Sequence, residues 1–352
     1  MPDDLNMRDQ SLFSRRRFSA AALALAFGGR RLLAEEKATG AIAPEIEAMR
    51  YFSSKTSGGK QFWADVWIFH DYRIQRHALT HHCRLLDGDN LRHASGTLEV
   101  CRARLDEIRK RDYLPPMEGK AVLVLHGLFR HRGTMDKLRT ALAAAGGFSV
   151  YCVGYPTTRG GVVDHAHSLD SAVRSLEGIT EINFVAHSLG NLVVRHWLND
   201  LAEEGRTLPD GQKFGRMVML APPNHQPQLA TTLIRGALAQ YVAGPAAQQM
   251  ANGWEKLQPK LATPQFDFGI LAGGKGDGRG YNPLIPGDDD AVITVESTRL
   301  AGARDFRLMP VLHSVFMNNH KAQEYTVKFL NDGHFESDET RQPIEAVDPS
   351  KP

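Results

Sequence analysis

The sequence contains only three cysteines, Cys83, Cys101 and Cys152, and their spacing fits neither a disulfide framework nor a zinc knuckle. One bridge, between Cys83 and Cys101, is conceivable in an oxidising compartment, but it requires a loop geometry that the sequence does not reveal. With 42% hydrophobic residues over 352 positions, the chain is large enough to be held together by a buried core instead of cross-links.

The chain also lacks a strong charge of one sign. It has 42 lysines and arginines against 40 aspartates and glutamates, which gives a formal net charge of +2. The first 34 residues carry six arginines against three aspartates, so the remainder is slightly acidic. Nucleic-acid-binding domains are typically strongly basic, and this balance argues against nucleic acid as the main partner.

No long hydrophobic run follows the start of the chain. The apolar, alanine-rich stretch over residues 19–29 is too short to span a bilayer. It comes directly after Ser14-Arg15-Arg16-Arg17-Phe18, which matches the twin-arginine export pattern, and before a second basic pair. We therefore expect residues 1–34 to be a twin-arginine-type signal segment and the protein to be periplasmic or secreted. The alternative is a basic, frayed N-terminal helix of a cytoplasmic protein.

The most informative stretch that is present is INFVAHSLG, residues 182–190. An apolar, strand-like run ends there, and a helical pattern starts at Asn191. Ala186 and Gly190 stand two places before and two places after Ser188. On a sharp turn from strand to helix, larger side chains at these two positions would collide. The stretch therefore predicts a nucleophile elbow that carries Ser188.

Strand-like and helix-like segments alternate on both sides of this stretch. The continuous apolar run over residues 121–125 is typical of a strand that is buried on both faces of a parallel sheet. Further strands are expected over residues 149–153, 182–186, 216–220, 266–271, 292–295 and 306–311, and helices over residues 135–145, 164–176, 191–202 and 321–330. Such alternation predicts an α/β fold, with a mostly parallel central sheet and helices on both faces.

The region before this alternation has a different pattern. Residues 62–69, 72–77 and 80–86 are expected to be antiparallel strands at the leading edge of the sheet, and residues 95–110 a helix. Five histidines lie here: His70, His77, His81, His82 and His93. Because the stretch alternates like strand, these side chains would not converge on one face, and we expect no metal site.

Two other segments interrupt the pattern. Residues 226–262 could be a helical cap inserted over the site or one more packing helix, and the apolar spacing favours neither. The glycine-rich loop over residues 273–280 lacks the Gly-Lys-Ser/Thr ending of a phosphate-binding loop, so it is interpreted as a mobile surface loop. We expect a single domain over residues 35–332, followed by a flexible polar tail over residues 333–352.

A serine nucleophile needs a base within hydrogen-bond reach and a carboxylate that orients the base. In this architecture the chain order is serine, acid, histidine. Asp290 and His313 follow Ser188 in that order. Asp290 is expected at the start of the strand over residues 292–295 and His313 after the last strand, so that both reach the carboxyl-side edge of the sheet on separate loops. Asp288 and Asp289 remain rivals for the acid, because a shift of one residue decides which carboxylate points inward.

Four segments together resemble the α/β-hydrolases, in particular bacterial secreted lipases and esterases. They are residues 121–128, 186–190, 290–297 and 313–315. The resemblance implies the α/β-hydrolase fold with Ser188 as nucleophile, His313 as general base and Asp290 as its orienting acid. It also implies the backbone N–H groups of Leu128 and Leu189 as the oxyanion hole.

The acid loop departs from the family pattern at one position, where Ala291 replaces a glycine. His126 and His187 are interpreted as residues that shape their loops, because neither occupies the position of the base.

The chemistry that the resemblance implies is hydrolysis of carboxylic esters, from small molecules or lipids, through an acyl-enzyme, with no cofactor or metal. An enzyme of this kind can also contact a membrane or lipid surface transiently. Thioesterase, amidase and acyltransferase activities use the same three residues, so they stay open. A non-catalytic α/β-hydrolase scaffold that acts as a binding protein is the alternative from another class.

Overall fold

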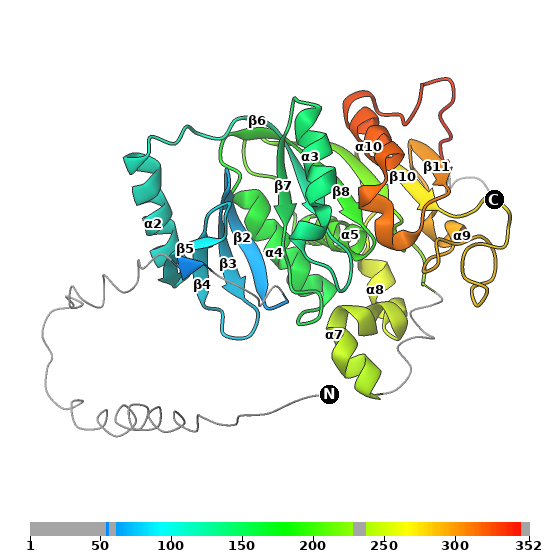
Figure 1. Cartoon of the computed structure of the whole chain (residues 1–352), viewed down its shortest axis with the longest axis horizontal. Coiled ribbons are helices and arrows are strands. Elements are labelled where there is room, and N and C mark those ends of the chain that lie inside the picture. Colours follow the sequence, from blue (N-terminus) through cyan, green and yellow to red (C-terminus); the bar gives the residue numbers. More distant parts are fainter. Residues whose placement is uncertain (1–53, 56–60, 228–236, 346–352) are drawn as a thin grey trace, which may run out of the picture. The chain divides into compact units, whose positions relative to one another are not determined.

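The central sheet has six strands, and every neighbouring pair is parallel. The computed structural model describes residues 54–55, 61–227 and 237–345, all within the unit Ala48–Pro352. The strand order is β11-β10-β9-β8-β6-β7. The strands are β6 (Gly119–Leu125), β7 (Ser149–Val153), β8 (Ile179–His187), β9 (Lys213–Leu220), β10 (Phe268–Gly273) and β11 (Asp305–Met309). The predicted parallel α/β sheet is confirmed (Figure 1).

Helices cover both faces of this sheet, as predicted. They are α3 (Asp136–Ala144), α4 (Val162–Arg174), α5 (Leu189–Glu203) and α10 (His320–Asp332), and a 3₁₀ turn, η1 (Arg132–Met135), leads into α3. Alternate residues of β6 belong to two different cores. Leu123 packs in the core that includes residues of α4 and α5, whereas Val122 and Val124 pack with residues of α3 and α10. A strand buried on both faces explains why β6 is a continuous apolar run rather than an alternating one.

The leading strands form a second sheet instead of an edge of the first, which corrects the prediction from the sequence. This antiparallel sheet has the order β1-β5-β4-β3-β2. Its elements are β1 (Ser54–Lys55), β2 (Trp63–Phe69), β3 (Tyr72–His77), β4 (Cys83–Leu86) and β5 (Leu91–Gly96), and α2 (Leu98–Arg111) follows. The two sheets are joined by Asp65. Its backbone N–H donates to the Gly154 carbonyl at 2.8 Å, and its carboxylate accepts from the Gly154 N–H at 2.6 Å.

The three cysteines are buried free thiols. The Cys83–Cys101 bridge considered from the sequence is therefore not formed. Burial raises the pKa of Cys101 and of Cys152 to about 12, so neither thiol is ionised at neutral pH.

The segment over residues 226–262 is mostly helical in its described part, and residues 228–236 lie outside the described residues. It contains α7 (Ala237–Ala251), α8 (Trp254–Leu257) and the 3₁₀ turn η2 (Gln258–Lys260). Gly244 interrupts α7 with φ 83°, and a Cβ there would lie 2.4 Å from the Thr158 carbonyl oxygen. Only glycine tolerates both conditions, so α7 is two short helices that meet at this residue. The role of the segment as a cap stays a prediction.

Two expectations near the C-terminus are wrong. Residues 292–295 are not a strand: they form a turn that runs into the short helix α9 (Val295–Thr298). The tail is not loose over its first part, because Phe335 is fully buried and its N–H donates to the Asp305 carboxylate at 2.8 Å. A further backbone hydrogen bond of 2.9 Å joins the Ile344 N–H to the Ala303 carbonyl.

The predicted export segment, residues 1–34, lies outside the described residues. Among the residues that the structure describes, none of the helices has the length and hydrophobicity needed to cross a bilayer.

Candidate active site

Ser188 lies on a sharp turn between β8 and α5. Its φ of 52° and ψ of −121° place a non-glycine residue in a conformation that costs of order 1–3 kcal/mol. The turn is held by the Ser188 N–H, which donates to the Leu220 carbonyl at 3.0 Å. A Cβ on Gly190 would lie 2.9 Å from the Leu125 Cβ, so this position requires glycine. Local geometry therefore agrees with the elbow predicted from the sequence.

His313 faces Ser188 from a different part of the chain. It is the first residue of the 3₁₀ turn η3 (His313–Asn318), which follows β11. Its Nε2 lies 3.0 Å from the Ser188 Oγ, and the side chain is nearly buried. The His313 carbonyl accepts a hydrogen bond of 3.0 Å from His187 Nε2, which ties the two loops together.

Asp290 completes a hydrogen-bonded line. Its Oδ2 lies 2.7 Å from His313 Nδ1, and the residue is fully buried. The other oxygen, Oδ1, accepts from the backbone N–H groups of Val292 at 3.0 Å and Ile293 at 2.7 Å. These two hydrogen bonds hold the carboxylate in one orientation. We therefore assign a proton to His313 Nδ1, which donates a hydrogen bond to Asp290 Oδ2.

The neighbouring aspartates have different partners. The Asp288 carboxylate accepts from the Lys275 and Gly276 N–H groups, both at 2.7 Å, and so anchors the glycine-rich loop. The Asp289 carboxylate accepts from the Ala291 N–H at 2.6 Å and the Asn282 N–H at 3.0 Å. Of the three candidates for the acid, Asp290 is the one at His313.

No family model and no curated protein matches the chain. Among solved structures, it is similar to phospholipase PlaB from Legionella pneumophila in complex with thio-NAD, at 21% identity, 51% coverage of this chain, 44% of that chain and a TM-score of 0.38. It is also similar to the hyperthermophilic esterase from the archaeon Pyrobaculum calidifontis, at 16% identity, 62% coverage of this chain, 76% of that chain and a TM-score of 0.43. A structure described under the metagenome-derived lipolytic enzymes LipS and LipT matches at 14% identity, 61% coverage of this chain, 94% of that chain and a TM-score of 0.44.

These values are too low to transfer an activity, so the fold assignment depends on the chain's own arrangement. A parallel sheet carries helices on both faces, a serine stands on a strained turn between strand and helix, and an acid and a histidine follow on later loops. The chain has the α/β-hydrolase fold.

Two small residues let the loops around Ser188 approach one another. A Cβ on Gly273, at the end of β10, would lie 2.7 Å from the Asp290 Cβ. A Cβ on Gly127 would lie 2.9 Å from His187 Nδ1 and 3.1 Å from the Ser188 Cβ. Both glycines stand at the carboxyl ends of strands, where ligands bind in such sheets. Gly127 belongs to the segment 121–128, one of those on which the resemblance rests, whereas Gly273 was not singled out from the sequence for this role.

The acid loop is strained at the position where the α/β-hydrolase pattern has glycine. Ala291 has φ 81°, in the left-handed region that an L-residue with a Cβ adopts at a cost of roughly 1–2 kcal/mol. The Asp290 carboxylate accepts from the N–H groups of Val292 and Ile293, and these two hydrogen bonds offset the strain at Ala291. The same bonds draw residues 292–293 into a turn, which is why the expected strand does not form.

The two amides that the resemblance assigns to an oxyanion hole lie on loops beside Ser188. Leu189 is the first residue of α5, where a backbone N–H has no acceptor within the helix. Leu128 follows the close contact at Gly127, and its half-buried side chain packs against Ala247 and Ala251 of α7. The Arg130 Nη2 donates to the Ser314 carbonyl at 2.8 Å, which joins the Leu128 loop to the His313 loop.

Two other histidines border the site, and both are neutral. Burial lowers the pKa of His126 to about 3, and burial together with the adjacent His313 lowers the pKa of His187 well below its ordinary value of 6.5. His126 stacks on Tyr155 with ring centroids 4.2 Å apart, and the Tyr155 hydroxyl donates to the His126 carbonyl. Their contacts agree with the expectation that they shape loops. Nothing in the sequence around Tyr155 indicated that it contacts His126.

No metal-binding cluster is found in the described parts of the chain, where no three histidine, cysteine, aspartate or glutamate side chains gather in a suitable way.

Proposed function

We propose that the chain is a serine hydrolase that cleaves carboxylic esters through an acyl-enzyme intermediate. The observation that carries this proposal is the unbroken line of short contacts from Ser188 through His313 to Asp290, with distances of 3.0 Å and 2.7 Å. The three residues are supplied by separate loops, up to 125 residues apart in the sequence. A chance arrangement would not also bury the acid and strain the serine.

In the proposed reaction, Ser188 Oγ attacks the ester carbonyl while His313 Nε2 accepts its proton. Asp290 holds Nδ1–H and stabilises the imidazolium that forms. The amides of Leu128 and Leu189 donate to the oxyanion of the tetrahedral intermediate. As that intermediate collapses, the proton on His313 passes to the leaving alcohol. Water then repeats the sequence on the acyl-enzyme, which releases the carboxylic acid and restores Ser188.

Exposed apolar side chains on the loops of Leu128 and His313 support an apolar acyl group, as in lipid esters. Phe129 is 58% exposed, on the loop that carries Leu128, and Leu312 and Val315 are 39% and 43% exposed on either side of His313. Exposed apolar residues gathered around a site mark an interaction surface. We propose that they contact the acyl chain or the surface of a lipid aggregate.

Export remains a proposal that rests on residues 14–31, with periplasmic or secreted location as its consequence. Fractionation of cells that express the full chain, with Arg15 and Arg16 both replaced by lysine as the control, tests it. Accumulation of the two proteins in the same compartment would rule out twin-arginine export.

Labelling with a fluorophosphonate probe, followed by peptide mapping, tests the nucleophile. We expect modification at Ser188 and none in Ser188→Ala, whose turnover should fall by roughly 10⁴-fold or more. Ser314→Ala is a matched control, because this exposed serine adjoins His313 and its hydroxyl is not part of the line. A Ser188→Ala protein that keeps its rate would eliminate this mechanism, whereas a wild type that resists the probe and hydrolyses no ester would favour a non-catalytic scaffold.

A panel of p-nitrophenyl esters from short to long acyl chains, run beside matched thioesters and anilides, tests the substrate class. We expect esters to be preferred and long chains to be accepted. A sharp decline beyond short chains would remove the lipid-ester assignment, and a preference for thioesters or anilides would move the chain to the thioesterases or amidases.

A further inference from the structure

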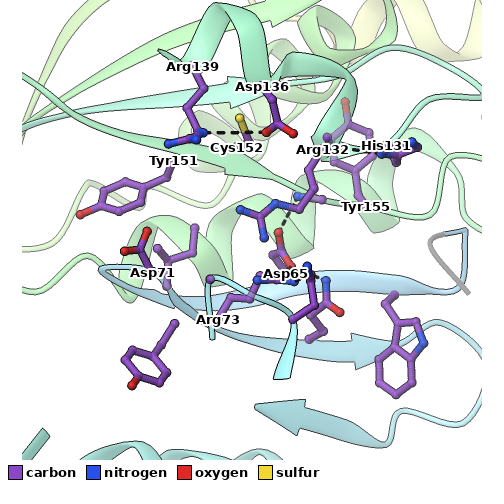
Figure 2. Close-up of a pocket in the computed structure, with 18 of the residues that line it drawn as sticks. Asp65, Asp71, Arg73, His131, Arg132, Asp136, Arg139, Tyr151, Cys152 and Tyr155 are labelled. Carbon is purple, nitrogen blue, oxygen red and sulfur yellow. Dashed lines mark hydrogen bonds and ion pairs between the residues drawn. The ribbon is translucent and has the colours of Figure 1, made fainter. Parts of the chain in front are cut away.

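A pocket lies between the antiparallel sheet and β7, and His126, which borders the active site, is among its lining residues (Figure 2). Its volume is about 690 Å³, within the range of small-molecule sites. Neither Ser188 nor Asp290 nor His313 lines it. Its walls come from β2, β3, β4 and the turn after β4 on one side, and from β7, the loop after β6, η1 and α3 on the other.

Four arginines line this pocket: Arg73, Arg84, Arg132 and Arg139. Arg73 is buried, with only 4% of its surface exposed, whereas Arg139 is at the solvent side and lies 3.8 Å from the Asp136 carboxylate. Among the lining acids, Asp71 is exposed to solvent. The inner part of the pocket is therefore cationic, and Figure 2 shows Arg132 and Arg73 directed toward the same space.

The carboxylate nearest to these guanidinium groups is already occupied. Asp65 is fully buried, and it accepts from Gln75 Nε2 at 2.7 Å and from the Gly154 N–H at 2.6 Å. Its distance to Arg73 Nε is 3.8 Å, long for a hydrogen bond. The single negative charge of Asp65 therefore offsets the positive charge of one arginine and cannot also offset that of a second.

The other two inner arginines have no acidic partner of their own. Both Nε and Nη2 of Arg84 donate to the neutral Gln75 Oε1, at 3.0 Å and 2.7 Å. Within the described residues, no hydrogen bond or ion pair joins Arg132 to a carboxylate. Burial, and after it the positive charge of Arg132, lowers the pKa of Arg73 to about 10. Like charges that face one partly dehydrated space repel each other, and a bound anion would remove that repulsion.

We propose that this pocket binds a small organic anion, with its phosphate or carboxylate group between Arg132 and Arg73. Planar guanidinium groups suit both kinds of oxyanion because they offer N–H donors in a fixed geometry. Arg73 Nη1 and Nη2 already donate to the Asp87 carbonyl and to Asn90 Oδ1, so its buried Nε, which has no hydrogen-bond partner among the described residues, is the donor that it would offer to the anion. Tyr72 and Tyr151 line the same pocket and provide flat surface for the organic part of the ligand. This inference does not depend on the proposed ester hydrolysis.

Isothermal titration calorimetry of the full chain tests the proposal, with pyrophosphate and citrate as probes of the two anion types. We expect at least one probe to bind with a dissociation constant below about 1 mM. Arg132→Gln should weaken that binding by roughly tenfold or more, since it removes a charged donor at nearly constant size. Arg174→Gln is the control, because Arg174 lies on α4, pairs with Asp170 and does not line the pocket. It should bind like the wild type.

The better-bound probe identifies phosphate or carboxylate as the preferred group. Binding should also persist after Ser188 has been labelled with a fluorophosphonate, because the two sites are separate. If Arg132→Gln does not fold, Arg84→Gln takes its place with the same expectation. The proposal is overturned if neither probe binds at about 10 mM, if a folded pocket variant binds like the wild type, or if labelling of Ser188 abolishes binding.

Discussion

Replacing Asp290 by asparagine tests the orientation of His313 without removing a heavy atom from the buried site. The two N–H groups at Asp290 Oδ1, from Val292 and Ile293, decide how the new amide sits. If the amide NH₂ faced them, two buried donors would lose their acceptor, at a cost of about 1–3 kcal/mol each. The asparagine oxygen therefore stays at Oδ1, and the NH₂ group faces His313 Nδ1.

In that orientation His313 Nδ1 must accept a hydrogen bond instead of donating one. The imidazole proton then moves to Nε2, which lies 3.0 Å from the Ser188 Oγ. A protonated Nε2 cannot take the serine proton, so the base is blocked while the packing is unchanged. For this inverted tautomer we expect kcat to fall by roughly 10⁴-fold, equivalent to about 5.5 kcal/mol of barrier, with KM changed by only a few-fold.

The assay is steady-state hydrolysis of a p-nitrophenyl ester, with Asp289→Asn as the matched control. Asp289 is also fully buried, but its carboxylate serves the loop amides of Ala291 and Asn282. We expect Asp289→Asn to lower stability and to keep the rate within about tenfold of the wild type. The reasoning is wrong if Asp290→Asn retains more than about a tenth of the wild-type kcat, or if the two variants lose the same amount.

Three further outcomes are expected. Gly190→Ala places a Cβ 2.9 Å from the Leu125 Cβ, and urea unfolding should show a loss of about 1–3 kcal/mol; full stability would mean that the elbow can open. Phe335→Ala removes a fully buried ring from the C-terminal segment and should cost about 3–5 kcal/mol in the same assay, whereas a cost near zero would mean that the segment is loosely held. Stability should also fall in acid because three histidines, His126, His165 and His187, are buried with pKa values lowered from 6.5. They stay neutral in the fold and gain protons in the unfolded chain, so the loss begins below pH 6.5 and continues toward about 4, at about 1.4 kcal/mol per pH unit for each histidine. Urea unfolding across this pH range checks the slope, and a flat profile would contradict the burial of these rings.

Local sequence patterns were sufficient for the parallel sheet. The expected ends of β7, over residues 149–153, coincide with those in the structure, and β6, β8 and β9 lie where their apolar runs predict. These strands are buried on both faces, so each has a strong signal of its own. By contrast β5 was missed. Only Ala94 of its six residues is fully buried, so the strand lacks the alternation of apolar and polar residues that would predict it.

Local patterns failed where a side chain competes with the backbone or where a partner is distant. The β-branched run at residues 292–295 predicts a strand, but the Asp290 carboxylate captures two of its N–H groups and makes a turn. Likewise, nothing in residues 62–86 indicates that their strands form a separate sheet. That arrangement depends on Asp65, which bonds to Gly154 from 89 residues away.

The same division holds for the site. Ser188, with small residues on both sides, could be identified from the sequence because an elbow imposes its requirement within five consecutive positions. The choice of Asp290 over Asp288 and Asp289 could not, since three adjacent carboxylates have the same local pattern and differ only in which one faces His313. The cationic pocket was equally hidden, because its arginines come from strands and loops that only the packed chain brings together. The steric requirements of a tight turn involve neighbouring residues, so the sequence alone determines them. Contacts between distant segments form only when the core packs, so the tertiary structure decides them.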